Sequence, residues 1–293
     1  MASNSLFLGV DGGGTRCRAR LCDAAGRQLG QGESGPANIR FGVRDALASV
    51  LAATRQALEQ AHLTAEDVPR ITACLALAGA TEPAERDAAQ AQRHAFHSAI
   101  ITSDAHAACV GAHSGLDGAV VIVGTGSIGW AVLRGRQYRI GGWGFELSDE
   151  GSGAWIGREL LRRTLLAHDG RTTWSALTRA IFGQFSTAQA IVQFATRATS
   201  RDYAALAPAV VEQAMRQDET ALAIMRVAAA HIDAIATRLL ALDVPRLSLT
   251  GGLAPHMLGF LSTTTRARLA APQGDALDGA LLLARATELA TAA

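Results

Sequence analysis

The sequence of 293 residues lacks an excess of charge and a long apolar run. It has 27 Lys and Arg against 26 Asp and Glu, with no run of like charge. Nucleic-acid backbones and membrane surfaces attract strongly basic segments, so we expect neither as a partner. No apolar run approaches the length of a transmembrane helix, and the N-terminal stretch MASNSLFLGV is too short and uncharged for a signal peptide. We therefore expect a cytoplasmic protein.

Cysteine is scarce, and the usual phosphate-loop motif is absent. The four cysteines follow no metal-binding motif and predict reduced, structural thiols: Cys17, Cys22, Cys74 and Cys109. No G-x-x-x-x-G-K-S/T segment occurs, and no Ser/Gly linker or low-complexity tract divides the chain. The hydrophobic content of 49% is enough for a sizeable core, and the length allows two domains.

What the sequence does have is a glycine-rich tip between two strands. The run LFLGVDGGGT joins an apolar strand to Asp11 and three consecutive glycines. Glycine adopts positive φ easily, so this backbone can turn sharply and point its N–H groups at a phosphate. The alternating segment 16–22 then predicts a second strand, where a dinucleotide-binding fold would need a helix. Asp11 is a candidate for holding Mg²⁺ through water; an ordinary tight hairpin is the alternative.

The same pattern returns further along the chain. Residues 120–136 again read as an apolar strand, a Gly-rich tip and a second strand. A weak internal repeat of this kind indicates two similar lobes whose tips can face one nucleotide. A third apolar strand ends in Thr-Gly-Gly at Gly252, as a loop that closely approaches a purine or ribose would. The three tips together predict a phosphate-binding cleft between two lobes.

Apolar runs and helical periodicity also predict the elements between these tips. Strands are predicted at 6–11, 16–22, 28–33, 70–78, 98–103, 119–124, 128–133 and 246–250, with a weaker one near 265–270. Helices are predicted at 43–61, 84–94, 105–112, 153–167, 187–199, 203–216, 219–242 and 277–290.

The tips, taken with the segment GGWGFELSDEGSGAWIG at 141–157, resemble the BadF/BadG/BcrA/BcrD-type branch of the sugar kinase, actin and Hsp70 ATPases. The likeness spans Phe7 to about Ala284. It implies an α/β fold with two ribonuclease-H-like lobes of the actin/hexokinase type and an ATP cleft between them. The N-terminal lobe would comprise residues 1–115, joined by a C-terminal helix at 277–293. The C-terminal lobe, 116–276, would bind nucleotide and carry a helical insertion.

Within this branch the chain is most similar to the N-acetylglucosamine kinases, with the bacterial glucosamine kinases as close neighbours. The resemblance implies a homodimer that uses ATP and Mg²⁺ to phosphorylate an amino sugar at its 6-hydroxyl. N-acetylglucosamine is the expected substrate and glucosamine the alternative. Ala78 stands where kinases of this kind carry a serine near the acetamido group, which leaves the choice between N-acetyl and free amine open.

Asp104 is the candidate general base. It ends an apolar strand and precedes a helical run, and open α/β sheets bind ligands at the carboxyl ends of their strands. The resemblance places the family's catalytic Asp here; a helix N-cap is the alternative. It also implies contacts with the sugar at Asn38, Trp143, Asp149 and Glu150. The alternatives are a turn residue for Asn38, a core aromatic for Trp143, and acids that complement a helix dipole for the other two.

The resemblance further assigns ATP and its phosphates to the three tips. The residues concerned are Gly12, Gly13, Gly14, Thr15, Gly124, Thr125, Gly126, Ser127, Gly251 and Gly252. Two other functions stay open. An activator of radical dehydratases shares the ATPase core but holds a 4Fe–4S cluster with cysteines, and the cysteine positions here do not match it. A non-catalytic, sugar-sensing ATPase is the other, and the presence of Asp104 argues against it.

Overall fold

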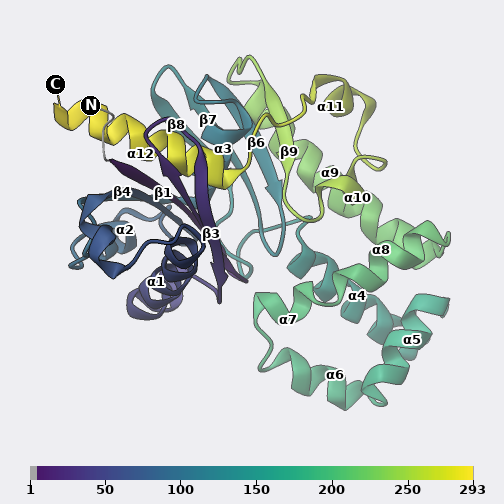
Figure 1. Ribbon diagram of the computed structural model, residues 1–293. Helices are drawn as coiled ribbons and strands as arrows, with labels where there is room; N and C mark the ends of the chain where they lie inside the picture. The colour runs from purple at the N-terminus through teal and green to yellow at the C-terminus, as the bar shows by residue number, and fades with distance from the viewer. Residues whose placement is uncertain (1–4, 293) are drawn as a thin grey trace. The chain divides into compact units, whose positions relative to one another are not determined.

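The computed structural model describes residues 5–292, which divide into two compact units (Figure 1). Unit 1 contains the described residues up to Val120, the segment Trp130–Tyr138 and the residues from Ala271 onward. Unit 2 contains Val121–Gly129 and Arg139–Ala270. The C-terminal segment therefore returns to the unit in which the chain begins.

Unit 1 is built on a five-stranded sheet with the order β3-β2-β1-β4-β5. The strands are β1 (Leu6–Gly12), β2 (Cys17–Asp23), β3 (Gln28–Ser34), β4 (Ile71–Leu77) and β5 (Ser98–Ser103). Strands β1, β2 and β3 form antiparallel hairpins, whereas β1, β4 and β5 run parallel. Gly12 pairs with Leu77, and Leu77 pairs with Ser103, so the three parallel strands end in one row.

Helices cover both faces of this sheet because side chains alternate along each strand. On one face, Leu8, Val10 and Leu21 belong to a core cluster that includes residues of α1 (Val43–Gln60). On the other face, Phe7 packs with Ala280 and Ala284 of α12 (Ala276–Ala292). Figure 1 shows α12 lying along this second face. The unit also contains the 3-10 turns Ile39–Phe41 and Ala65–Arg70 and the helices α2 (Pro83–Gln90) and α3 (Asp104–Ala112).

The second sheet has the order β8-β7-β6-β9. Its strands are β6 (Gly118–Val123), β7 (Ser127–Leu133), β8 (Arg136–Gly141) and β9 (Leu247–Thr250). Unit 2 carries the remaining helices: α4 (Gly153–His168), α5 (Ala176–Phe185), α6 (Ala188–Ala195), α7 (Ser200–Ala204), α8 (Ala207–Met215), α9 (Glu219–Leu240), α10 (Ala254–Met257) and α11 (Thr263–Arg268). The long helical stretch predicted between the second and third tips is confirmed.

The observed elements differ from the predicted ones at several points. The predicted strand near 265–270 is instead the end of α11, followed by a single bridge from Leu269 to Leu247. The predicted helix 203–216 is two helices, because Pro208, the second residue of α8, has no N–H to donate to the carbonyl of residue 204. Strand β8 and helix α5 were not predicted. Finally, α9 is long and apolar enough to span a membrane, although it packs against α4 and α8 as a core helix does.

Candidate active site

Asp104 is the first residue of α3 and directly follows β5, at the row where the parallel strands end. The helix N-cap is Ser103, whose hydroxyl accepts a hydrogen bond from the His106 N–H at 3.1 Å. The alternative role of Asp104 as the N-cap is therefore wrong. The Asp104 carboxylate lies at the carboxyl edge of the sheet, and its Oδ1 accepts the N–H of Ala105 at 2.9 Å.

The environment of Asp104 makes it a stronger base than an ordinary aspartate. Burial raises the pKa of Asp104 to about 6, and the negative charge of Asp11 contributes to that rise. Hydrogen bonds from the backbone N–H groups of Ala105 and of Asp104 itself oppose the rise in this pKa without cancelling it. A carboxyl whose pKa lies near the working pH is suited to proton abstraction.

Asp11 lies at the same edge, beside the first glycine tip. The antiparallel pair of Gly12 with Cys17 closes the β1–β2 hairpin, and the Gly13 N–H donates to the Arg16 carbonyl at 2.9 Å. The predicted hairpin tip is confirmed, but the reason given for its glycines is wrong, because none of Gly12, Gly13 and Gly14 has positive φ. Gly12 is required by close packing: a Cβ there would lie 2.6 Å from Leu77 Cδ2.

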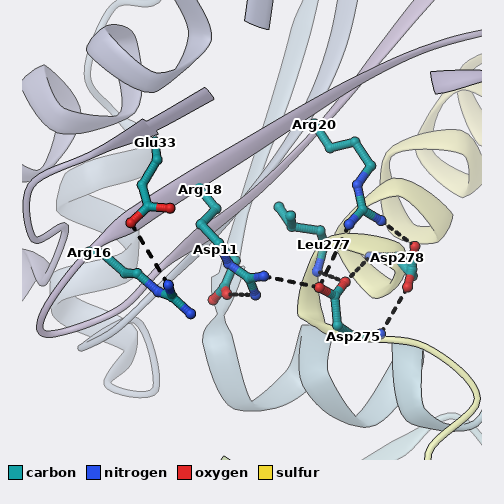
Figure 2. A network of polar contacts seen from close by, with 8 residues as sticks. All are labelled: Asp11, Arg16, Arg18, Arg20, Glu33, Asp275, Leu277 and Asp278. Atoms are coloured by element: carbon teal, nitrogen blue, oxygen red, sulfur yellow. Dashed lines mark hydrogen bonds and ion pairs between the residues drawn. The ribbon is translucent and has the colours of Figure 1, made fainter. Parts of the chain in front are cut away.

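The tip beyond Gly12 is open. A Cβ on Gly14 would meet no atom within 4 Å, and Gly13, Gly14 and Thr15 are half-buried or exposed. Asp11 is half-buried, and its Oδ2 accepts a hydrogen bond from Arg18 Nη2 at 2.7 Å (Figure 2). Arg18 was not among the predicted site residues. The alternation of CRARLCD places it on the Asp11 face of the sheet, but nothing in the sequence identifies its partners.

Asn38 reaches the same edge from the segment after β3. It forms a parallel bridge with Ala78, the residue that follows β4, and the Ile39 N–H donates to the Ala78 carbonyl at 3.0 Å. The Asn38 Oδ1 caps the turn Ile39–Phe41 by accepting the Arg40 N–H at 3.0 Å, so the turn role is present. Its NH₂ group is the part of the side chain suited to a ligand's hydroxyl.

Gly79 makes room for Asn38 and was also missed. It has φ +88°, and a Cβ there would lie 2.8 Å from Asn38 Oδ1. Unit 1 thus brings together Asp11, the first glycine tip, Asn38, Ala78 and Asp104 at the ends of adjacent strands.

The second tip, Gly124–Ser127, closes the hairpin between β6 and β7 in unit 2. The Gly124 N–H donates to the Gly126 carbonyl at 2.9 Å. The first two N–H groups of α4 also donate to this tip, from Gly153 to the Gly124 carbonyl at 2.8 Å and from Ala154 to the Thr125 carbonyl at 3.1 Å. The tip is therefore held by the start of α4.

The third tip packs on the end of β6. Gly251 has φ +96°, and a Cβ there would lie 2.4 Å from the Val123 carbonyl oxygen. The Leu253 N–H donates to that same oxygen at 3.0 Å. A Cβ on Gly252, in contrast, would meet no atom within 4 Å. The second and third tips are thus neighbours within unit 2, and Gly252 leaves open space beside them.

Asp149 and Glu150 lie against the second tip. Asp149 has φ +63°, and its Oδ2 would lie 2.7 Å from a Cβ on Gly126. The Glu150 carbonyl accepts the Ser127 hydroxyl at 2.8 Å. Neither residue lies within α4, which begins at Gly153 with Ser152 as its N-cap. The alternative of two acids in the first turn of that helix is therefore wrong.

Trp143 is exposed to 55% and not a core aromatic. It stands between Gly142 (φ +70°) and Gly144 (φ +104°), and the Arg139 guanidinium lies 3.8 Å from its ring centroid. Arg139 also donates Nε to the Gly141 carbonyl at 3.0 Å and Nη2 to the Gly142 carbonyl. One face of the indole is thus stacked on a cation that fixes the loop. Sequence reasoning missed Arg139.

The donor set for a metal is small. Among residues 5–292, no group of three His, Cys, Asp or Glu could hold an ion. Mg²⁺ does not need one, because it keeps several waters and takes only one or two carboxylates together with substrate phosphates. A single half-buried carboxylate beside an open glycine tip fits that mode of binding, and Asp11 is that carboxylate.

The chain is similar to known proteins along nearly its whole length. The model of the BadF/BadG/BcrA/BcrD ATPase family matches residues 8–284. The chain is 38% identical over 281 residues to the glucosamine kinase GspK of Vibrio cholerae, with 96% of each chain covered. A structure assigned as an N-acetylglucosamine kinase, from Chromobacterium violaceum, has a TM-score of 0.90 and 36% identity, covering 96% of this chain and 99% of that one. A ROK family glucokinase from Streptomyces griseus, solved with glucose and AMPPNP, shows the shared fold alone, with a TM-score of 0.60, 20% identity and coverage of 96% and 100%.

Proposed function

The chain belongs to the BadF/BadG/BcrA/BcrD ATPase family, and from that premise we propose that it transfers the γ-phosphate of ATP to the 6-hydroxyl of glucosamine, with Asp104 as the general base. The coarser activity, that of an amino sugar kinase with the fold of the actin, hexokinase and ROK proteins, follows from its relatives. The observation that carries the proposal is the carboxyl of Asp104, with its pKa raised to about 6, at the carboxyl edge of a parallel sheet.

In the proposed reaction Asp104 accepts the proton of the 6-hydroxyl while the sugar oxygen bonds to phosphorus and the bond to the ADP oxygen breaks. Phosphoryl transfer requires little covalent work from a protein, so positioning and electrostatics supply most of the rate. Asn38 would orient a sugar hydroxyl with its NH₂ group, and Trp143, Asp149 and Glu150 would complete the sugar contacts.

ATP would be bound by the three glycine tips. Backbone N–H groups of the first two tips would hold phosphates, and Gly252 would leave room for the nucleoside. Asp11 would hold Mg²⁺ through water. The ion, when bound, neutralises charge on the transferring phosphate. Use of ATP as the donor is consistent with a cytoplasmic location.

Glucosamine is preferred to the initially expected N-acetylglucosamine for two reasons. The relative with the higher identity, over 96% of the chain, is a glucosamine kinase. Ala78, beside Asn38, has no hydroxyl to bond an acetamido group. N-acetylglucosamine is the second candidate, since the similar solved structure is assigned to that activity.

The cysteines favour a kinase over a dehydratase activator. All four are buried, and burial raises the pKa of the Cys17, Cys74 and Cys109 thiols to about 12. Cluster ligands must be thiolates at an accessible subunit axis, which these thiols do not provide.

The test is ATP consumption with glucosamine, N-acetylglucosamine, N-acetylmannosamine and glucose, followed by ³¹P NMR of the product. We expect Mg²⁺-dependent ADP release with glucosamine at the highest kcat/KM, and phosphate on C6. Phosphate on C1, or ADP release that does not depend on any hexosamine, would contradict the proposal. The latter outcome would support a sugar-sensing ATPase.

A further inference from the structure

Arg18 joins the candidate magnesium carboxylate to the C-terminal helix. Its Nη2 donates to Asp11 Oδ2 at 2.7 Å, and its Nη1 donates to Asp275 Oδ2 at 3.1 Å (Figure 2). Asp275 in turn accepts the N–H groups of Leu277 and Asp278, at 2.9 and 3.1 Å, and so caps the first turn of α12. One guanidinium therefore spans a strand end and a helix start that are far apart in sequence.

The strand register explains why these groups meet. Asp11 pairs with Arg18 and Gly9 pairs with Arg20, so both arginines project from the face of the sheet that α12 covers. Gly9 lets the helix approach closely, because a Cβ there would lie 2.7 Å from the Leu277 carbonyl oxygen. The acidic first turn of α12 is thus brought directly over the arginines of β2.

Arg20 is a natural comparison for Arg18. Its Nη2 lies 3.7 Å from Asp275 Oδ2, and its Nη1 donates to Asp278 Oδ1 at 2.5 Å. The two side chains are exposed to 22% and 18%, and each has a buried Nε without a hydrogen-bond partner among the described residues. Of these two arginines, Arg18 alone donates a hydrogen bond to Asp11. The two arginines therefore contribute similarly to the helix docking and differ at the candidate metal site.

We propose that Arg18 is a positioning residue for magnesium: it fixes the direction of the Asp11 carboxylate and makes the first turn of α12 part of the support for that carboxylate. The inference rests on the assignment of Asp11 to Mg²⁺ in the proposed function. A guanidinium suits this task because its planar fork can donate to two carboxylates at once, which a lysine ammonium on a flexible stem does less well.

Two effects of Arg18 on the ion oppose each other. Its positive charge repels Mg²⁺, whereas its hydrogen bond holds the carboxylate in one orientation. Orientation should dominate, because Mg²⁺ demands near-octahedral geometry and the carboxylate acts through ordered water. Loss of partners that orient a metal ligand typically reduces metal affinity or activity about 10- to 100-fold.

The experiment compares Arg18→Gln with Arg20→Gln in the full chain. For Arg18→Gln we expect the Mg²⁺ concentration for half-maximal rate to rise about 10- to 100-fold, with kcat at saturating Mg²⁺ and the KM for the sugar little changed. Arg20→Gln should lose a similar amount of thermal stability and keep the wild-type Mg²⁺ requirement. Arg18→Lys should need more Mg²⁺ than the wild type but less than Arg18→Gln, since an ammonium can still donate to Asp11.

A second readout does not depend on turnover. ADP should raise Tm more with Mg²⁺ than with EDTA, and Arg18→Gln should lose most of that Mg²⁺-dependent increment while Arg20→Gln keeps it. If a Gln variant does not fold, Arg18→Lys and Arg20→Lys form the matched pair, and only Arg18→Lys should raise the Mg²⁺ requirement.

The inference is overturned if Arg18→Gln needs no more Mg²⁺ than the wild type, or if Arg20→Gln shifts the requirement equally. Asp11→Asn separates this inference from its premise. An unchanged Mg²⁺ requirement in that variant would remove Asp11 from the metal site and overturn both, whereas a raised requirement in Asp11→Asn but not in Arg18→Gln would overturn only the role of Arg18.

Discussion

The position of the Asp104 carboxyl group in the fold changes its acidity. The backbone N–H of Ala105 fixes one oxygen, and burial together with Asp11 destabilises the charged form. In Asp104→Asn the amide can still accept the Ala105 N–H but cannot take a proton. We expect kcat to fall about 10²- to 10⁴-fold, equal to roughly 3 to 5 kcal/mol of barrier, with the KM for the sugar little changed.

Stability provides the control for that substitution. Because the pKa of Asp104 is raised in the folded protein, its ionised form opposes folding at neutral pH, and Asp104→Asn should leave Tm at pH 7 unchanged or higher. A carboxylate with a purely structural role would give a lower Tm. Retention of more than about a tenth of the wild-type kcat would remove Asp104 from the mechanism.

The pH dependence of the rate follows from the same pKa. The carboxylate is the active form, so kcat/KM, which reports the pKa of the free enzyme, should decrease as the pH falls through about 6. An aspartate with an ordinary pKa of about 3.9 would keep kcat/KM constant down to about pH 5. A pH–rate profile between pH 5 and 8 distinguishes the two, and a flat acidic side would contradict the role of Asp104.

For individual residues, the sequence predicted the candidate site residues but not the residues that hold them in position. Asp104 and Asn38 could be singled out because each matches a motif. Arg18, Arg139 and Gly79 were missed, since each acts on a residue brought near by the fold. Arg18 meets Asp275 across 257 positions of sequence, and no local pattern predicts that contact.

At the scale of elements, strands with a continuous apolar run were predicted well. Strand β4 is buried along its whole length, and its prediction at 70–78 is confirmed at Ile71–Leu77. Strand β8 was missed because RQYRIG is polar and nowhere fully buried, so it has neither an apolar run nor a clear alternation. A local sequence pattern does not predict a strand that is stabilised by its neighbours and not by burial of its own side chains.

The turn after β9 offers a test with a matched control. Gly251→Ala would place a methyl group 2.4 Å from the Val123 carbonyl oxygen at φ +96°, so the turn must shift. We expect a loss of about 1 to 3 kcal/mol in the free energy of unfolding and weaker ADP binding. Gly252→Ala has open space and should keep the wild-type Tm. Equal Tm values for the two variants would contradict this account of the turn, and thermal unfolding with ADP titration measures both effects.

For the whole molecule, the proposal for ATP names residues in each of the two units. Unit 1 contributes the first glycine tip, and unit 2 contributes the second and third. Unit 1 itself is assembled from three stretches of chain, so its core includes residues from both ends of the sequence, such as Phe7 and Ala284. A ligand that contacts all three tips should therefore slow hydrogen exchange in both units.

Hydrogen exchange with and without Mg²⁺ and ADP supplies that measurement. At a ligand concentration about 100-fold above Kd, binding contributes about 2.7 kcal/mol, which corresponds to about 100-fold slower exchange where opening requires release of the ligand. We expect this protection in peptides covering 12–16, 124–127 and 250–253. The β2–β3 turn at 23–27 is the internal control, because it closes another hairpin of the same sheet, beyond the opposite end of β2. Protection confined to one unit would refute the assignment of ATP to all three tips, and equal protection of the control turn would mean general stabilisation without a local contact.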